Sequence, residues 1–262
     1  MNRAIWIRFG TLAVLWSLPR SAIAEGSRPF DPGDDIAGAY AASARTMPKG
    51  FMAVRDRQIA LLEFLYAVHD RIQLSAGMTL PVMQVGFTLD AKVLLVDHSR
   101  FRLSGLASFG TLIFYIGPNI YLVGGGPALV ADLCLDETCR SSVSIGSQFY
   151  PVFVSEKWHD TRDHWTIFLV NSHAAAVVAV SAKVKLLFGF GHAGGKPHSG
   201  GRFESALYLD YGVRLHGENF GLDLWLVRPF VAFDGAEPRS VEEVMKYLPI
   251  GYPFLSFTYQ WR

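Results

Sequence analysis

The stretch RFESALYLDYGVRLHGENFGLDLWLVRPF, residues 202–230, decides the fold because its side chains alternate over two long segments. From Phe203 to Leu215 the odd-numbered residues are aromatic or aliphatic except for one serine, and the even-numbered residues carry all the charges. After the polar turn 216–219 the alternation restarts at Phe220. Period two is the period of a β-strand, whose successive side chains point to opposite faces. The stretch therefore predicts a long antiparallel β-hairpin.

The length of these segments separates two kinds of β protein. Strands of soluble proteins usually have about five or six residues, whereas a strand that crosses a bilayer at a tilt needs roughly ten. In a membrane barrel the apolar face meets lipid and the charged face lines the lumen. We therefore predict an all-β protein, a transmembrane antiparallel up-and-down β-barrel.

Composition excludes two other classes of protein. Hydrophobic residues make up 50% of the 262 residues, charged residues make up 18%, and the formal net charge is +1. A chain so near neutrality is not a nucleic-acid binder that works by bulk charge. After residue 24 the longest run of small apolar residues, 174–182, is far shorter than the roughly 18 residues of a membrane helix.

The first residues have the pattern of an export signal. Arg3 and Arg8 precede the short apolar run 9–18, and Ala22-Ile23-Ala24 is a small-x-small cleavage site. We predict a signal peptide over residues 1–24, a loose periplasmic N-terminal segment over 25–45, and the barrel over 46–262.

The last residues, FLSFTYQWR (254–262), again alternate, with Leu255, Phe257, Tyr259 and Trp261 on one face. A closed barrel must pair its last strand with its first, so the chain is expected to end in a strand. An alternating aromatic terminal strand also resembles the signal that the barrel-assembly machinery recognises in Gram-negative outer-membrane barrels. Arg262 departs from the commonest form of that signal, in which the aromatic residue is last.

About twelve extended segments account for the chain after residue 45. They are expected at 46–55, 58–68, 72–80, 85–96, 101–116, 120–133, 141–154, 165–180, 183–191, 202–215, 220–231 and 254–262.

The links between these segments alternate in length. Those at 69–71, 97–100, 134–140, 181–182 and 216–219 are short, several others (155–164, 192–201, 232–251) are longer, and 56–57 breaks the rule. Short turns on the periplasmic side and longer outer loops are the outer-membrane arrangement. Ser240 and Glu243 form a capping box, which predicts a short helix in the last extracellular loop.

Charged residues with inward parity predict a cross-linked lumen. Five acids and five bases are expected to face it: Glu63, Asp90, Glu204, Asp210 and Asp223, with Lys92, Arg102, Lys183, Lys185 and Arg214. Equal numbers of each sign favour a hydrogen-bonded interior over a pore selective for one sign of charge. A barrel of this size is either plugged or narrowly conducting.

The sequence offers few groups for chemistry. Cys134 and Cys139 flank a turn in an exported chain, which predicts a disulfide. The loop around His159, Asp160, Asp163 and His164 could bind zinc or copper weakly, but a solvated loop between interfacial tryptophans needs no ligand, and we predict no metal. Ser172 and His173 are adjacent on one strand, so they face opposite sides and cannot pair directly. No catalytic residue, enzyme activity or cofactor is predicted.

Three stretches carry a resemblance: ARTMPKG (44–50), FLYAVHDRIQLSAGMTL (64–80) and the aromatic terminal strand. The chain resembles the uncharacterised outer-membrane β-barrel proteins of Gram-negative bacteria. The resemblance implies a barrel in the outer membrane, and no functional residues carry over with it.

The leading functional hypothesis is a narrow, porin-like passive channel or a structural envelope protein. One alternative is a ligand-binding or lipid-modifying barrel that acts through its extracellular loops, and a further one is a soluble periplasmic β domain. The expected partners are outer-membrane lipid, the barrel-assembly machinery and a small solute, without nucleic acid. The oligomeric state stays open.

Overall fold

The computed structural model describes residues 30–37, 41–57, 61–79, 84–114, 119–158, 161–197, 203–234, 237–239 and 250–262. The expected signal peptide and the expected helix over 241–248 lie outside these residues. The described strands are β1 (Met52–Arg57), β2 (Leu61–His69), β3 (Ile72–Thr79), β4 (Gln84–His98), β5 (Phe101–Phe114), β6 (Asn119–Cys134), β7 (Ser142–Trp158), β8 (Thr161–Ala179), β9 (Val184–Pro197), β10 (Glu204–His216), β11 (Phe220–Asp234), β12 (Glu237–Arg239) and β13 (Tyr252–Trp261).

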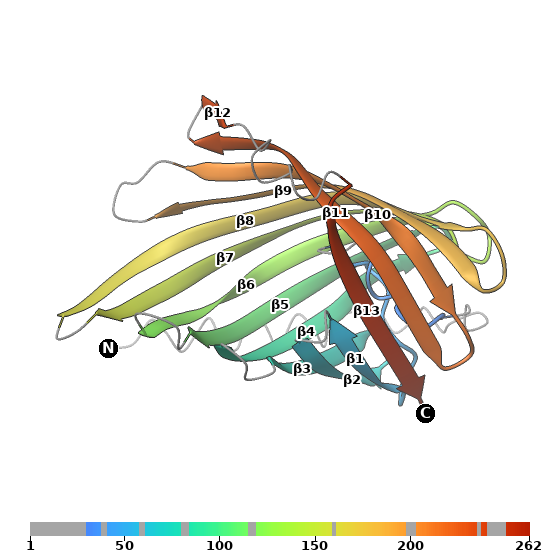
Figure 1. The fold of residues 1–262 in the computed structure, drawn as a ribbon. Coiled ribbons are helices and arrows are strands. Elements are labelled where there is room, and N and C mark those ends of the chain that lie inside the picture. Colours follow the sequence, from blue (N-terminus) through green and yellow to red (C-terminus); the bar gives the residue numbers. More distant parts are fainter. Residues whose placement is uncertain are drawn as a thin grey trace.

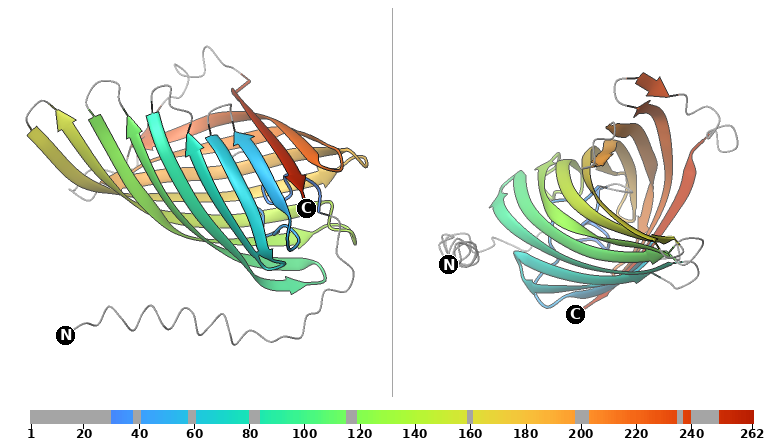
Figure 2. Two further views of the ribbon diagram at one scale, coloured as in Figure 1. Left: turned by 90° about the horizontal axis from the view of Figure 1, so that it is seen from below. Right: turned by 90° about the vertical axis from the view of Figure 1, so that its left-hand side faces the viewer.

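Twelve of these strands form a closed antiparallel barrel (Figures 1 and 2). Each strand from β1 to β11 pairs with its neighbour in the chain, and β13 pairs with both β11 and β1. The short strand β12 pairs with the far end of β11 and is not a member of the ring. The predicted fold class, a twelve-stranded up-and-down barrel closed by the terminal strand, is confirmed.

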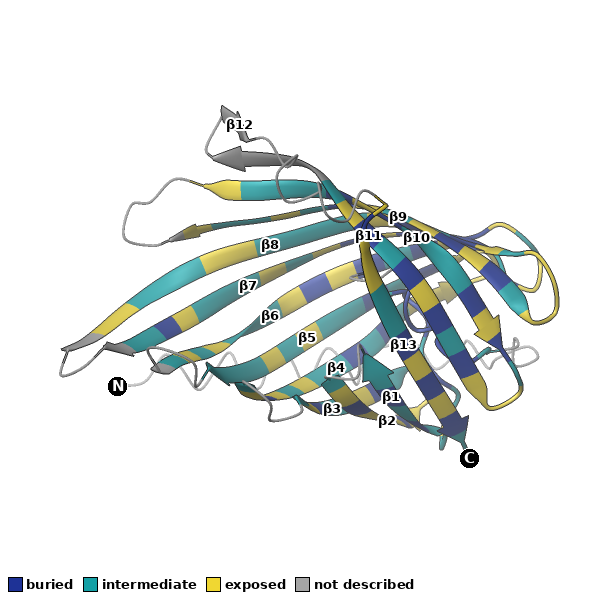
Figure 3. Cartoon of the chain, in the orientation of Figure 1, coloured by how far each residue is buried: buried dark blue, intermediate teal, exposed yellow. Residues whose placement is uncertain are grey.

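The two faces of the wall have the polarity that the alternation predicts. Along β10 the side chains of Asp210 and Arg214 are buried inside the barrel, whereas Leu209 and Leu215 are exposed on its outer face. Figure 3 shows the same alternation of buried and exposed residues along the described strands. A two-layer sandwich would bury its apolar faces against each other, so the soluble alternative does not describe this fold.

The wall is uneven in height. Strands β1, β2 and β3 have 6, 9 and 8 residues, whereas β7 and β8 have 17 and 19. The expected loop 155–164 is mostly strand, because the β7–β8 ladder continues to Trp158↔Thr161. The expected loop 192–201 is likewise strand as far as Pro197. Polar side chains in these stretches do not prevent pairing, since a hairpin ladder satisfies the backbone whatever the side chains.

The first strand lies later in the chain than expected. It begins at Met52 rather than at residue 46, and Asp56 and Arg57, expected in a turn, pair with both β2 and β13. Among the described residues no helix is both long and apolar enough to cross a membrane.

Candidate functional site

The segment that precedes the barrel lies inside it. Residues 30–37 and 41–47, called here the plug segment, form a tight turn at Asp31–Ile36 and a bridge between Ile36 and Ala42. The plug segment lies within the ring of strands, where the chain is coloured blue in Figure 2. The expectation of a loose periplasmic segment over 25–45 is therefore wrong for its described residues.

Small residues let the plug segment fit in the lumen. Ala37, Ala41 and Ala44 are buried, and the first two pack in one cluster with Trp225 of the wall. Gly33 has a positive φ of 87°, a conformation that residues with a side chain rarely adopt. A Cβ at Gly33 would also lie 3.1 Å from Cζ of Arg214. Backbone conformation and space therefore both favour glycine at the turn.

Polar contacts fix the plug segment to eight of the twelve barrel strands. The wall residues that make them are Arg55 (β1), Gln73 (β3), Lys92 (β4), Ser104 (β5), Asp132 (β6), His173 (β8), Lys185 (β9) and Arg214 (β10). Most of them are near the short-turn ends of their strands. The plug segment thus spans the lumen close to the short turns and is held from all around the ring.

Asp34 and Asp35 are the electrostatic centre of the plug segment. Asp34 pairs with Arg45 and with two wall cations, Lys185 at 2.5 Å and Arg214 at 3.4 Å. Asp35 pairs with Arg55 and accepts a hydrogen bond from Gln73 Nε2 at 3.2 Å. Burial alone would raise the pKa of both carboxyl groups, but the surrounding cations outweigh it and lower the pKa of each below its ordinary value.

Two lysines of the wall donate their hydrogen bonds to the plug segment. The Lys92 ammonium donates to the backbone carbonyls of Asp35, Ser43 and Arg45, each at 3.0 Å. Lys185 pairs with Asp31 at 2.8 Å as well as with Asp34. A buried charge is tolerated only when it is paired and hydrogen-bonded, so removal of the plug segment would leave these cations without those partners.

The structure places most of the ten predicted lumen residues inside, but pairs them differently from the expectation. Two members of the set, Arg214 and Asp223, form an ion pair. Their Nε–Oδ1 distance is 2.6 Å and their Nη2–Oδ2 distance is 2.8 Å. Glu63 pairs with Arg55 and Arg57, Asp90 accepts from Ser75, and Asp210 is buried. Arg102 pairs with Asp97.

Two predicted members are not in the buried network. Lys183 lies in the turn between β8 and β9 and is exposed, because β9 begins at Val184. The prediction that Lys183 faces the lumen is wrong. Glu204 lines the cavity at the far end of β10, where its side chain is exposed to solvent.

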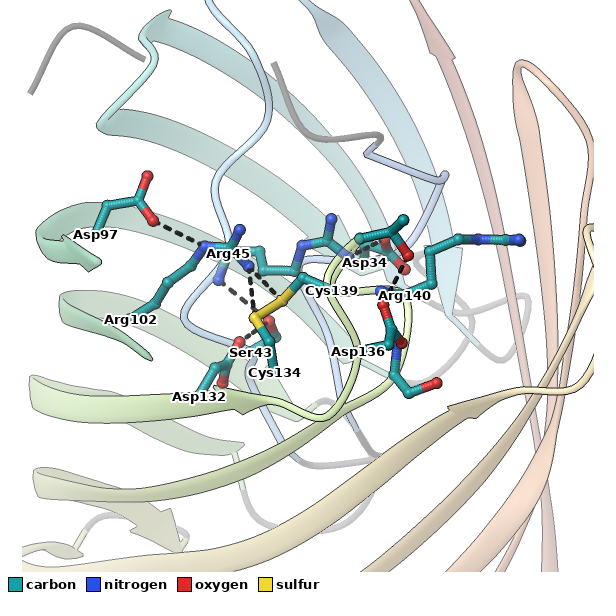
Figure 4. The surroundings of a disulfide bond; sticks show 12 residues. Asp34, Ser43, Arg45, Asp97, Arg102, Asp132, Cys134, Asp136, Cys139 and Arg140 are labelled. Carbon is teal, nitrogen blue, oxygen red and sulfur yellow. Dashed lines mark hydrogen bonds and ion pairs between the residues drawn. A yellow bond between two sulfur atoms is a disulfide. The ribbon is translucent and has the colours of Figure 1, made fainter. Parts of the chain in front are cut away.

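Cys134 and Cys139 form a disulfide with a Cα–Cα distance of 4.7 Å (Figure 4). Arg102 Nη1 lies 2.9 Å from Sγ of Cys139, and next to the disulfide Asp132 accepts a hydrogen bond from Ser43 of the plug segment. Asp136 organises the same turn: burial by itself would raise its pKa, but hydrogen bonds from the Thr138 hydroxyl and the backbone amides of Arg140 and Ser141 together lower it to about 2. Arg140 of the same turn pairs with Asp31 of the plug segment at 3.5 Å, which links the turn to the plug.

Two adjoining cavities lie in the lumen, on the long-loop side of the plug segment. The cavity next to the plug, called the lower one, measures about 580 Å³ and has Asp35, Ile36, Ala41 and Ala42 of the plug in its lining. The upper one, about 810 Å³, shares Tyr150, Leu169 and Asn171 with the lower and extends to Glu204 and Pro229 near the far ends of β10 and β11. We call the two cavities together the cup.

The lining of the upper cup is mainly apolar, with a few hydroxyl and amide groups and the carboxyl group of Glu204 at its far end. Its apolar members include Ile167, Leu169, Val227 and Tyr252. The Tyr208 hydroxyl donates to Oδ1 of Asn171 at 3.2 Å, and the Tyr150 hydroxyl donates to Gln148, whose amide donates to Ser108 at 3.0 Å. Such a lining suits a molecule with an apolar body and few hydrogen-bonding groups.

Two further candidate sites from the sequence are the metal-binding loop around His159 and the pair Ser172–His173. His159 and Asp160 lie outside the described residues, and no group of three potential metal ligands occurs among those that are described. Nε2 of His173 lies 3.2 Å from the Ala42 carbonyl inside the barrel, whereas Ser172 contacts Ser147 outside it. The two neighbours face opposite sides, as the alternation predicts.

The chain is similar to several solved structures at low sequence identity. No family model and no curated protein matches the chain. A loop-deletion mutant of OmpT, an outer membrane protein of Vibrio cholerae, is 12% identical with a TM-score of 0.43 over 77% of this chain, which spans 62% of that protein. The translocator domain of the autotransporter NalP from Neisseria meningitidis is 11% identical, TM-score 0.43, over 80% of this chain and 85% of that one.

The toluene transporter TbuX of Ralstonia pickettii is 10% identical with a TM-score of 0.38, over 91% of this chain and 100% of that one. At these scores the similarity concerns the fold alone. Closure, face polarity and strand length define the class of this chain: a β-barrel of the Gram-negative outer-membrane type, here with an internal plug.

Proposed function

We propose that the protein is a gated outer-membrane barrel, whose cup binds a small neutral solute with an apolar body and whose plug segment closes the lumen on the periplasmic side. The observation that carries the proposal is the anchoring of the plug to eight strands directly beneath the cup. A permanently open passive channel would keep its lumen free at this level. The short turns face the periplasm in this arrangement, and the cup opens toward the long-loop side.

The lining supports a neutral solute over an anion. Glu63 and Arg55 at the bottom of the cup are already paired with other charges, so they neutralise each other. Above them the lining carries hydroxyls, amides and the carboxyl groups of Asp90 and Glu204, and apolar side chains cover the rest. A lone anion would lose its hydration without a cationic partner, which is costly.

Conductance in planar bilayers tests the gate. The wild-type barrel is expected to stay closed, and the double variant Asp34→Asn/Asp35→Asn is expected to show discrete openings because the plug loses its anionic centre. Asp70→Asn is the matched control, since Asp70 is an exposed turn residue that accepts the amide of Lys49 outside the lumen. Equal conductance of wild type and double variant would refute the gate, and silence of both would favour a purely structural barrel.

Solute binding is tested separately with n-octanol as the probe and octanoate as its charged counterpart. Calorimetric titration of the purified barrel is expected to show octanol binding that Ala206→Trp abolishes, because Ala206 lines the upper cup. The control is Leu209→Trp on the outer face of the same strand. Equal binding to the two variants, or preference for octanoate, would overturn the assignment of the cup.

The proposal includes two partners. We expect the exposed apolar face to contact membrane lipid, and β13 to present Phe257 and Tyr259 outward to the assembly machinery, with Thr258 and Gln260 buried on the lumen side.

A further inference from the structure

Three polar side chains lie in a row on the outer face of the wall. In the strand register Ser147 of β7 is opposite Ser172 of β8, and Ser172 is opposite His192 of β9. Directly opposite residues of an antiparallel pair share a face, with Cβ atoms about 4.5–5.5 Å apart. The row ends on Leu129 of β6 and Leu207 of β10. We call these three residues the outer polar row.

The neighbours show that the row faces outward. Ile145 and Phe149 on either side of Ser147, and Phe190 beside His192, are all exposed large apolar residues. The residues between them alternate inward, as His173 does with its contact to the plug segment. The row is therefore a polar interruption of the apolar face.

The row rises toward the long-loop side of the membrane. Ser147, Ser172 and His192 lie five, seven and eight residues from the short-turn ends of their strands. At a strand tilt of about 40° each residue adds roughly 2.5 Å of height, which puts the row at about 13 to 20 Å within an apolar band about 25 Å tall. Lys196, two outward positions beyond His192, is exposed. His192 therefore lies near the upper edge of the band.

Polar groups at this depth need partners. The hydroxyl oxygens of Ser147 and Ser172 are 2.8 Å apart, and a bond between them uses one of their two protons. The imidazole of His192 stacks on Phe203 with ring centroids 6.2 Å apart, which positions the ring without using its N–H. Lipid tails offer no acceptor, so polar side chains in this region are expensive and mark functional sites.

A groove adjoins the row. It measures about 500 Å³ and includes Leu129, Ile145 and Phe190 in its apolar lining, together with all three residues of the row. That volume falls within the range of roughly 300–1,000 Å³ typical of ligand pockets. An acyl chain in the groove would bring its ester carbonyl against the free hydroxyl proton and the imidazole N–H.

We propose that the outer polar row and its groove bind an acyl-ester lipid of the leaflet on the long-loop side. The chain lies against Leu129, Ile145 and Phe190, and the ester carbonyl accepts hydrogen bonds from Ser172 and His192. The side chains of the row point away from the lumen, so the proposal does not rest on the gate or its solute.

Native mass spectrometry of the purified full chain tests the proposal with two probes. One is a diacyl phosphatidylethanolamine, and the other is its diether analogue, which has the same chains and head group but lacks the ester carbonyls. The wild type is expected to retain the diacyl lipid about threefold better or more, the factor expected for one hydrogen bond in a membrane. In Ser147→Ala/Ser172→Ala/His192→Leu the ratio is expected to fall to about one.

The control is Ser205→Ala, a serine on the outer face of β10 that is not part of the groove. It is expected to keep the preference of the wild type. The triple variant places apolar side chains against lipid, so it is expected to fold, and the heat-dependent gel mobility of the barrel checks this. Equal retention of the two lipids by the wild type, or a preference that survives in the folded triple variant, would overturn the proposal.

Discussion

Substitution of Asp34 by Asn is the sharpest test of how the plug is held. The side chain of Asp34 is 2% exposed and contacts three cations, Arg45, Lys185 and Arg214. Asn keeps the shape of the residue but removes the charge. Lys185 would keep its ion pair with Asp31, and Arg214 would keep its ion pair with Asp223. The substitution therefore weakens the attachment of the plug and leaves the hydrogen-bonded strand pairs of the barrel intact.

The magnitude follows from the burial of the pairs. Removal of one partner of a buried ion pair costs about 3–5 kcal/mol. Because two of the three cations retain another carboxylate, we expect the lower end, about 3 kcal/mol, in the equilibrium between docked and released plug. At about 1.4 kcal/mol per factor of ten, the released population should rise roughly a hundredfold.

Trypsin cleavage after Arg45 reports that population, because Arg45 is buried in the docked plug. When release and redocking are fast, the cleavage rate tracks the equilibrium population of the open form. We expect Asp34→Asn to be cleaved there about a hundred times faster than the wild type, and Asp70→Asn to be cleaved at the wild-type rate. An unchanged rate for Asp34→Asn would show that the ion pairs do not hold the plug.

Three further predictions concern the wall, the turn and pH. Leu224→Arg on the outer face should cost about 2–4 kcal/mol in lipid, measured by urea unfolding in vesicles. Loss of the Cys134–Cys139 link should lower the free energy of unfolding by about 2 kcal/mol for so short a loop, measured in the same way on the double serine variant. Because the folded-state pKa values of Asp34 and Asp35 are lowered, their stabilisation is complete above about pH 3.8 and is lost only as pH falls through the lowered values. Both carboxylates should stay ionised at pH 3, so bilayer conductance of the wild type should be absent at pH 7 and at pH 3.

Each of these has a control. Glu218→Arg lies in the β10–β11 turn and should leave the free energy of unfolding nearly unchanged, so an equal cost at both positions would contradict a lipid-facing Leu224. Reduction of the wild type should reproduce the double serine variant. The Asp34→Asn/Asp35→Asn barrel should conduct at both pH values, and opening of the wild type already at pH 3 would show that groups other than Asp34 and Asp35 control the gate.

The fold could be predicted because charged and apolar residues alternate along its strands. Along residues 203–226 the charges and the apolar side chains separate by parity, which fixes both strands and which face meets lipid. The terminal strand pairs with β1, as closure requires. The predicted strand ends were less accurate where a polar stretch continues the ladder, as it does up to the pair Trp158 and Thr161. A polar stretch of sequence indicates exposure to solvent, but it does not show where strand pairing ends.

The site could be predicted only in part, because parity shows where a side chain points but not what it meets. Lys92 and Lys185 were correctly assigned to the lumen, but the expected partners on the wall are not the groups that they contact. The carboxylates that meet these cations come from a segment that has no periodicity. Its signal is the cluster Asp31, Asp34 and Asp35 followed by small residues, which together suit a charged, narrow interior.

The uneven wall has a consequence for the surrounding bilayer. With roughly 2.5 Å of height per residue, β1 reaches about 15 Å and β8 nearly 50 Å, against an apolar band about 25 Å tall. Hydrophobic mismatch of this kind is relieved by thinning of the bilayer or by tilting of the protein. We therefore expect the membrane to be pinched beside β1–β3, and the protein to gain stability in lipids with shorter chains.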